Sequence, residues 1–162
     1  MYIAALDIGG TKTIAAVLDE NGKVVIKEQF SSIVSNYEKH LELCAQTLER
    51  LMQQIKIGTE NLEGLGISLP GIVDREKGIL IYAPYANWKN IAVADYFRNA
   101  LGIDKIQCEN DVNACAVGEI HFGLGKRYTD FVWMTLSTGV GGAVVENSRL
   151  IRGGHGFAGE FG

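Results

Sequence analysis

The chain has 162 residues, of which 47% are hydrophobic and 21% are charged, and its formal net charge is −4. This composition is ordinary for a globular protein and provides a core for one domain, or for one domain and part of another. The negative charge excludes a broadly basic surface, and no apolar run resembles a membrane span or a signal peptide, so we expect neither nucleic-acid nor membrane partners. The three cysteines form no CxxC pair, which indicates reduced thiols in the cytoplasm.

Strand and helix patterns alternate along the chain and predict an α/β fold. Apolar residues spaced by three and four predict a long helix with Cys44 on its buried stripe, and Asn21-Gly22 is typical of a hairpin turn. The expected elements are three strands within residues 2–30, a helix over 36–57, a strand over 62–69, a turn at 70–71, a loop over 74–88, a helix over about 91–101, a strand over 105–110 and a helix over 111–123.

Residues 131–151 repeat the plan of the first 25 residues: an apolar strand, a glycine turn, a second apolar strand and a hairpin that contains Asn. In the second copy Ser148 stands where the first has Gly22. Two copies of one unit predict two pseudo-symmetric lobes with a cleft between them. We expect the boundary near Asn110, which divides the chain into lobes 1–109 and 110–162.

The glycines follow apolar strands in tight groups, which indicates loops shaped around a ligand. In Asp7-Ile8-Gly9-Gly10-Thr11-Lys12, the two glycines expose backbone N–H groups suited to phosphate oxygens, while Thr11 adds a hydroxyl and Lys12 a positive charge. Asp7 could hold Mg²⁺ through water molecules. A simple glycine hairpin is the alternative, and the spacing matches neither a Walker loop nor a Rossmann fingerprint.

A second glycine turn, residues 137–142, has the same chemistry without the acid. Two such turns on opposing lobes would grip a nucleoside triphosphate from both sides. Between them, Glu109-Asn110-Asp111 ends a strand and begins a helix. Asp111 is either the N-cap of that helix or a carboxylate that accepts the proton of a hydroxyl in phosphoryl transfer.

The segments DIGGTK, LPGIVD, END, STGVGG and HGFAGEFG occur in this order and together resemble the ROK family of sugar kinases and related repressors. The resemblance implies an actin-like, ribonuclease H-like (ASKHA) two-lobed α/β fold, with mixed sheets flanked by helices. It also implies an enzyme that transfers the γ-phosphoryl group of ATP, with Mg²⁺, to a hexose or an N-acetylhexosamine, usually at the 6-hydroxyl. The partner would be a small-molecule sugar.

The resemblance also assigns roles to single residues. Asp111 matches the catalytic base, and Asp7 lies near Mg²⁺. ATP and phosphate contacts are implied for Asp7, Gly9, Gly10, Thr11, Lys12, Thr138, Gly139, Gly141 and Gly142. Sugar contacts are implied for Gly71, Asn110, Asp111 and Glu160.

The chain departs from the family pattern in two places. After Ala83-Pro84 many members have Asn, where this chain has Tyr85. Members also usually continue past GEFG with a His, a Cys-rich zinc loop and the adenine site, so structural zinc is expected only in that further part. We therefore expect this chain to be a fragment with little or no activity by itself. Its incomplete second lobe should leave an unpaired sheet edge and apolar surface, which favours a homo-oligomer.

The alternative within the family is the sugar-sensing effector module of a repressor. Such repressors carry a winged-helix segment ahead of the kinase-like part. Here Met1 leads directly into the first strand and the net charge is acidic, so the kinase is favoured.

Overall fold

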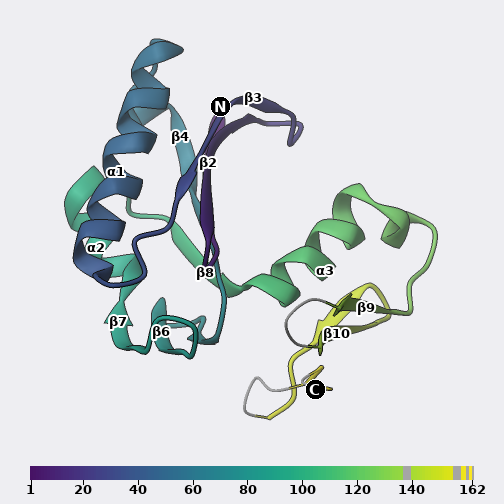
Figure 1. Cartoon of the computed structure of the whole chain (residues 1–162). Coiled ribbons are helices and arrows are strands. Elements are labelled where there is room, and N and C mark those ends of the chain that lie inside the picture. Colours follow the sequence, from purple (N-terminus) through teal and green to yellow (C-terminus); the bar gives the residue numbers. More distant parts are fainter. Residues whose placement is uncertain (137–139, 155–157, 160, 162) are drawn as a thin grey trace. The chain divides into compact units, whose positions relative to one another are not determined.

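The computed structural model describes residues 1–136, 140–154, 158–159 and 161. The chain forms two compact units, Met1–Glu109 and Asn110–Gly162, each with strands and helices of its own (Figure 1). Their correspondence to the two expected lobes stays a prediction, and each unit is described below by itself.

A five-stranded sheet in the order β3-β2-β1-β4-β8 forms the centre of the first unit (Figure 1). β1 pairs antiparallel with β2 and parallel with β4, so the carboxyl ends of β1 and β4 lie at the same edge. The three strands predicted within residues 2–30 are confirmed. The strands are β1 (Tyr2–Ile8), β2 (Lys12–Asp19), β3 (Val24–Ser31), β4 (Leu62–Leu69) and β8 (Ile106–Asn110).

Two helices, α1 (Tyr37–Gln54) and α2 (Val93–Leu101), share one apolar core with this sheet. α1 begins where the side chain of Asn36 accepts a hydrogen bond from the Lys39 N–H at 2.9 Å. The predicted burial of Cys44 is confirmed, because Leu41, Cys44, Leu48 and Leu51 are buried with strand β1, whereas Tyr37, at the start of the same apolar spacing, is exposed. The 3₁₀ turn η1 (Thr59–Asn61) leads into β4.

A small antiparallel sheet, β5-β6-β7, occupies the segment where a loop was predicted for residues 74–88, and that prediction is wrong. The strands are β5 (Ile72–Asp74), β6 (Ile79–Ala83) and β7 (Trp88–Ala92). They form because Leu80, Ala83 and Trp88 are buried in the main core. α2 begins at Val93 rather than near Ile91, since Ile91 pairs with Leu80 in the sheet.

The second unit packs the helix α3 (Asp111–Phe122) against an antiparallel sheet in the order β11-β10-β9. The strands are β9 (Phe131–Leu136), β10 (Val140–Glu146) and β11 (Arg149–Ile151), and the 3₁₀ turn η2 (Leu124–Lys126) follows α3. Its core contains Ala116, Ala143 and Val145. α3 ends at Gly123, as predicted.

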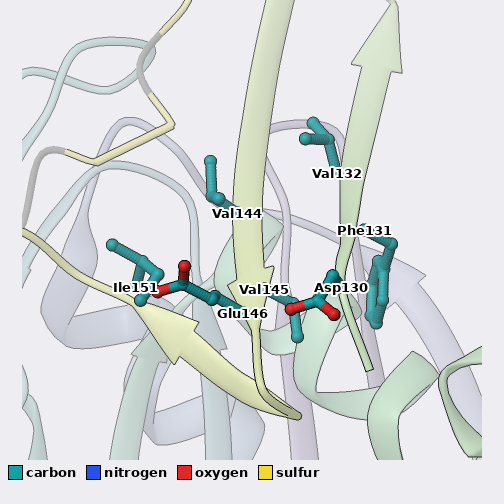
Figure 2. A pocket seen from close by; sticks show the side chains of 7 residues that line it. All are labelled: Asp130, Phe131, Val132, Val144, Val145, Glu146 and Ile151. Atoms are coloured by element: carbon teal, nitrogen blue, oxygen red, sulfur yellow. The ribbon is translucent and has the colours of Figure 1, made fainter. Parts of the chain in front are cut away.

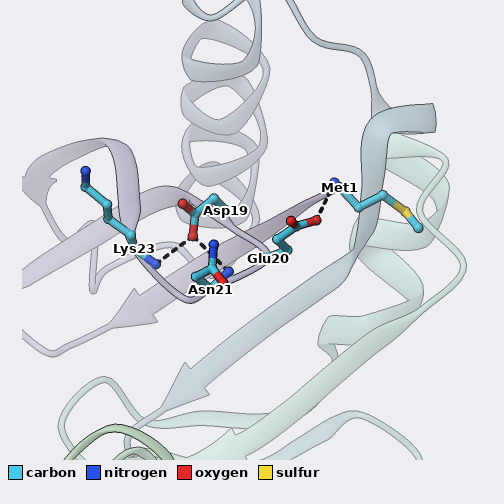
Figure 3. A network of polar contacts seen from close by, with 5 residues as sticks. All are labelled: Met1, Asp19, Glu20, Asn21 and Lys23. Carbon is cyan, nitrogen blue, oxygen red and sulfur yellow. Dashed lines mark hydrogen bonds and ion pairs between the residues drawn. The ribbon is translucent and has the colours of Figure 1, made fainter.

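The turns between β2 and β3 and between β10 and β11 both close a hairpin, but different residues stabilise them. In the first, the Asp19 carboxylate accepts hydrogen bonds from the Asn21 and Lys23 N–H groups, both at 2.9 Å, and Glu20 pairs with the amino group of Met1 (Figure 3). In the second, Asn147 and Ser148 have φ values of 51° and 58°, which is the type I′ geometry that suits a two-residue hairpin. The predicted hairpins are confirmed.

None of the three cysteines forms a disulfide. Burial raises the pKa of both Cys44 and Cys108 to about 12, whereas Cys115 on α3 is exposed. Over the described part of the chain, no helix has the length and apolar character needed to cross a membrane.

Candidate active site

The first glycine motif forms a tight turn between β1 and β2. The Gly9 N–H donates to the Lys12 carbonyl at 3.0 Å, and a Cβ at Gly9 would stand only 2.8 Å from that oxygen. A Cβ at Gly10 would stand 2.9 Å from the ring of Tyr85. Both positions therefore favour glycine, and Gly10, Thr11 and Lys12 are exposed. The geometry is that of a compact turn with accessible backbone, as phosphate binding requires.

Asp7 lies one residue before the end of β1 and is held by a neighbour that the sequence pattern did not single out. In the sheet it stands beside Ser68 of β4, whose hydroxyl donates to Asp7 Oδ1 at 2.9 Å. The Asp7 side chain is exposed at the same edge as the glycine turn. A single oriented carboxylate beside a glycine turn is compatible with Mg²⁺, which keeps several of its waters. No group of three or more His, Cys, Asp or Glu residues suited to a metal ion occurs among the described residues.

Gly71, a predicted sugar contact, has a backbone that only glycine adopts readily. Its φ is +130°, and a Cβ there would stand 2.2 Å from the Tyr82 carbonyl oxygen and 3.1 Å from the Ala83 Cα. Two residues further along, the ring of Tyr85 covers Gly10. The segment 82–85 thus contacts both Gly71 and the glycine turn between β1 and β2.

The Tyr85 ring also lies against Trp88, with the ring centroids 5.9 Å apart. Trp88 is buried and donates from Nε1 to the Val34 carbonyl at 2.9 Å, so it serves as a fixed support for Tyr85.

Asn110, not Asp111, is the N-cap of α3. The Asn110 side chain accepts a hydrogen bond from the Asn113 N–H at 3.1 Å, and Asp111 is the first helical residue, with Oδ1 accepting from the Val112 N–H at 2.9 Å. The capping alternative for Asp111 is therefore wrong, because the helix begins one residue earlier than that role requires. Asn110 and Asp111 are both partly exposed at the N-terminus of α3.

Gly141 and Gly142 lie within β10, opposite Thr135 and Met134 of β9, so their placement in a turn is wrong. A Cβ at Gly141 would stand 3.2 Å from a methyl carbon of Val112, which places the first turn of α3 directly against β10. The structure therefore brings Gly141 close to the residue that follows Asp111. Thr138, Gly139 and Glu160 lie outside the described residues.

One face of the second unit's sheet carries exposed apolar side chains. Alternate residues of β9, namely Val132, Met134 and Leu136, have exposed fractions of 53%, 53% and 77%. Figure 2 shows a shallow depression on this sheet, where Val132, Val144 and Ile151 come from three adjacent strands. It is lined by Asp130, Phe131, Val132, Val144, Val145, Glu146 and Ile151.

The sequence profile of the ROK family matches residues 3–162, and the chain belongs to the ROK family. A solved ROK family glucokinase from Streptomyces griseus, in complex with glucose and AMPPNP, superimposes with a TM-score of 0.87 at 30% identity, over 100% of this chain and 50% of that chain. The fold is therefore the actin-like α/β fold of the ROK sugar kinases, with mixed sheets flanked by helices.

Two curated relatives show the functional range of the similarity. A glucokinase from Thermotoga maritima is 32% identical over 165 residues, which cover 100% of this chain and 50% of the relative. A xylose repressor from Bacillus subtilis is 29% identical over 162 residues, which cover 99% of this chain and 41% of the relative. The chain thus spans about half the length, or less, of these relatives.

Proposed function

We propose that the full-length protein is an ATP-dependent sugar kinase that phosphorylates a hexose or an N-acetylhexosamine at its 6-hydroxyl. The observation that carries this proposal is the turn between β1 and β2. There two sterically required glycines, an exposed Lys12 and an oriented Asp7 stand at one sheet edge. The similarity to glucokinases supports the choice of a sugar as acceptor.

The donor side of the proposal uses both glycine motifs. The Gly9 N–H is bonded to the Lys12 carbonyl, so Gly9 would shape the turn, while the Gly10 N–H, Thr11 and Lys12 would bind the phosphates of ATP. The second motif, Thr138, Gly139, Gly141 and Gly142, would contribute further contacts. Asp7 would hold Mg²⁺ through water, and the ion would offset the charge on the phosphates.

The acceptor side centres on Asp111, the proposed catalytic base. Its carboxylate takes the proton of the sugar hydroxyl as the hydroxyl oxygen bonds to the γ-phosphorus, and the bond from that phosphorus to the β–γ bridging oxygen breaks to release ADP. Gly71, Asn110 and Glu160 would contact the other sugar hydroxyls. Holding donor and acceptor in line could supply roughly 7–11 kcal/mol of the barrier reduction.

The test is an ATP-consumption assay of the full-length protein with glucose, mannose, fructose, N-acetylmannosamine and N-acetylglucosamine. Phosphorylation of at least one sugar, dependent on Mg²⁺ and reduced by Asp111→Asn, is the expected result. The absence of turnover with every sugar would contradict the proposal.

The second candidate is the sugar-sensing effector module of a ROK-type repressor, which the similarity to the xylose repressor favours. Under this alternative the full-length protein binds sugar and releases DNA without turning over ATP. A gel shift with its own promoter DNA, with and without the sugars above, distinguishes the two functions.

We also propose that the chain associates with a second copy of itself through the apolar face of β9. The support is the exposure of Val132, Met134 and Leu136, since apolar side chains gathered on one sheet face favour association. Sedimentation should show a dimer that Met134→Lys dissociates. A monodisperse wild-type monomer would contradict this.

A further inference from the structure

A continuous line of hydrogen bonds runs from the buried His40 on α1 to the carbonyl of Gly9 in the phosphate turn. His40 Nε2 lies 3.0 Å from Thr13 Oγ1, which lies 2.9 Å from Ser32 Oγ. Ser32 Oγ donates to the Gly9 carbonyl at 2.6 Å. The residues come from three separate parts of the first unit, and no chemistry proposed above uses this line.

The direction of the line is fixed at its far end. The Ile33 N–H donates to His40 Nδ1 at 3.2 Å, so in a neutral imidazole Nε2 carries the proton and donates to Thr13. Thr13 then donates to Ser32, and Ser32 donates to Gly9. Each hydroxyl accepts one hydrogen bond and donates one, so the line has a single polarity.

The line is buried at its His40 end, and its buried polar atoms all have hydrogen-bond partners. His40 and Thr13 have exposed fractions of 0%. No buried side-chain nitrogen or oxygen atom lacks a hydrogen-bond partner among the described residues. The rings of Phe30 and Trp88 flank the imidazole, with centroids 6.1 Å and 5.7 Å away. Leaving a buried polar group without a hydrogen-bond partner costs considerable free energy, so this line of hydrogen bonds should keep its geometry.

The geometry of the peptide group connects this line to phosphate binding. The Gly9 carbonyl and the Gly10 N–H belong to one planar trans peptide group, in which they point in opposite directions. When Ser32 holds the Gly9 oxygen, the Gly10 N–H points away from Ser32, and because Gly10 is exposed a phosphate oxygen could accept from it. The Tyr85 ring over Gly10 limits the remaining freedom of that residue.

We propose that His40 and Thr13 are positioning residues that set the Gly9–Gly10 peptide for binding the phosphates of ATP, acting through Ser32. The proposal rests on the kinase function proposed above. Neither residue would touch the nucleotide. Loss of the line should therefore weaken nucleotide binding while leaving sugar binding unchanged.

The kinetic test compares Thr13→Val, which keeps the shape and removes the hydroxyl, with Thr13→Ser, which keeps the hydroxyl. In the full-length protein, Thr13→Val should raise KM for ATP roughly tenfold and leave KM for the sugar within about twofold, and Thr13→Ser should stay near wild type. Thr47→Val is the matched control, because Thr47 is equally buried and its hydroxyl accepts a hydrogen bond from Arg50 at 3.5 Å and is not a member of this line. Equal rises in KM for ATP in Thr13→Val and Thr47→Val would overturn the proposal.

A measurement on the chain itself separates this proposal from the kinase function. In ¹⁵N NMR spectra, Thr13→Val and Ser32→Ala should shift the Gly10 amide resonance, whereas Thr47→Val should not, and the His40 nitrogens should report the Nε2–H tautomer. These results would uphold the positioning even if the full-length protein phosphorylates no sugar. An unmoved Gly10 amide in both variants, or the Nδ1–H tautomer, would overturn it. Ser32 is only half-buried, so its variant keeps the test available if Thr13→Val fails to fold.

Discussion

The β1–β2 and β9–β10 hairpins follow one sequence plan but have different surroundings. Counted back from the turn, Ile8, Leu6 and Ala4 of β1 match Leu136, Met134 and Val132 of β9. The first three are buried in the core shared with α1, whereas the second three are more than half exposed. In the second unit α3 packs on the other side, against Phe131, Trp133 and Ala143.

This difference teaches that the repeated pattern predicts which side chains are apolar but does not predict what covers them. The two carboxylates proposed for the site also differ in position. Asp7 stands on the first strand of its hairpin, whereas Asp111 stands on the helix α3, which packs against β10. Four predictions test the comparison, in order of decreasing expected effect.

The largest effect is expected from Asp111→Asn in the full-length protein. If the Asp111 carboxylate is the catalytic base, turnover should fall roughly 10²–10⁴-fold while sugar affinity is largely kept, because the amide of Asn cannot accept the hydroxyl proton. Steady-state kinetics and sugar binding measure the two effects. Asp95→Asn, at an exposed position on α2, is the control and should change neither. Unchanged turnover in Asp111→Asn would show that Asp111 is not the catalytic base.

The next effect is a difference in stability between two matched truncations, Leu6→Ala on the buried face of β1 and Met134→Ala on the exposed face of β9. In a single copy Leu6 is 2% exposed and Met134 is 53% exposed, so at concentrations that keep the chain monomeric the first change should cost about 2–5 kcal/mol of unfolding free energy and the second less than about 0.5 kcal/mol. Urea denaturation of the chain measures both. Equal losses in the monomer would contradict the comparison, whereas a Met134→Ala loss that grows with protein concentration would support the proposed second copy on the β9 face.

A smaller effect distinguishes the glycines of the two hairpins. A Cβ at Gly9 meets the backbone oxygen of Lys12, while a Cβ at Gly142 meets the ring of Phe161, a half-exposed side chain that can turn away. Gly9→Ala should therefore lower the unfolding free energy by about 1–3 kcal/mol, and Gly142→Ala by less than about 1 kcal/mol. The two midpoints in urea give this comparison directly, and the reverse order would contradict it.

The smallest effect is a pH dependence that belongs to the first unit alone. Burial lowers the pKa of His40 below its unfolded value of about 6.5. Between the folded-state and unfolded-state pKa values, the unfolded chain therefore binds more protons than the folded chain. The contribution of His40 to stability is complete above about pH 6.5 and is lost as the pH falls from there through the folded-state pKa. Cys44, the titratable neighbour of His40 at 3.7 Å, has a pKa of about 12 and stays protonated there.

Urea midpoints measured at several pH values across that range test this dependence. His40→Gln should show a flatter profile than wild type over the same pH range. A wild-type profile unchanged by the substitution would contradict the role of His40 in the acid sensitivity.

The sequence predicts the fold well wherever a periodic pattern extends over many residues. The 18-residue helix α1 and the strands β1 to β4 have such patterns. The small sheet was missed because β5, β6 and β7 have 3, 5 and 5 residues, too short for alternation to stand out from a loop. The cap of α3 was misassigned because Asn and Asp are equally good N-cap residues, and only the phase of the helix decides between them.

The candidate site was predicted as motifs but not as a network. Asp7, Gly9 and Gly10 stand out by local spacing, whereas Ser68 and Ser32 are hydroxyl residues with no local signal. Ser68 meets Asp7 across 61 positions of sequence, and His40 meets Thr13 across 27. Such partners depend on strand register and helix packing, which one sequence does not specify.

The unequal burial of the cysteines gives this molecule a selective chemical handle. Thiolates are the species that alkylating reagents attack, so Cys44 and Cys108, buried and with pKa values of about 12, should resist labelling at neutral pH. Cys115 is exposed and stands four residues after Asp111 on α3, and therefore on the same face one helical turn away. A maleimide dye or spin label should thus attach at one defined position beside the proposed base. It would report on nucleotide and sugar binding without any engineered residue.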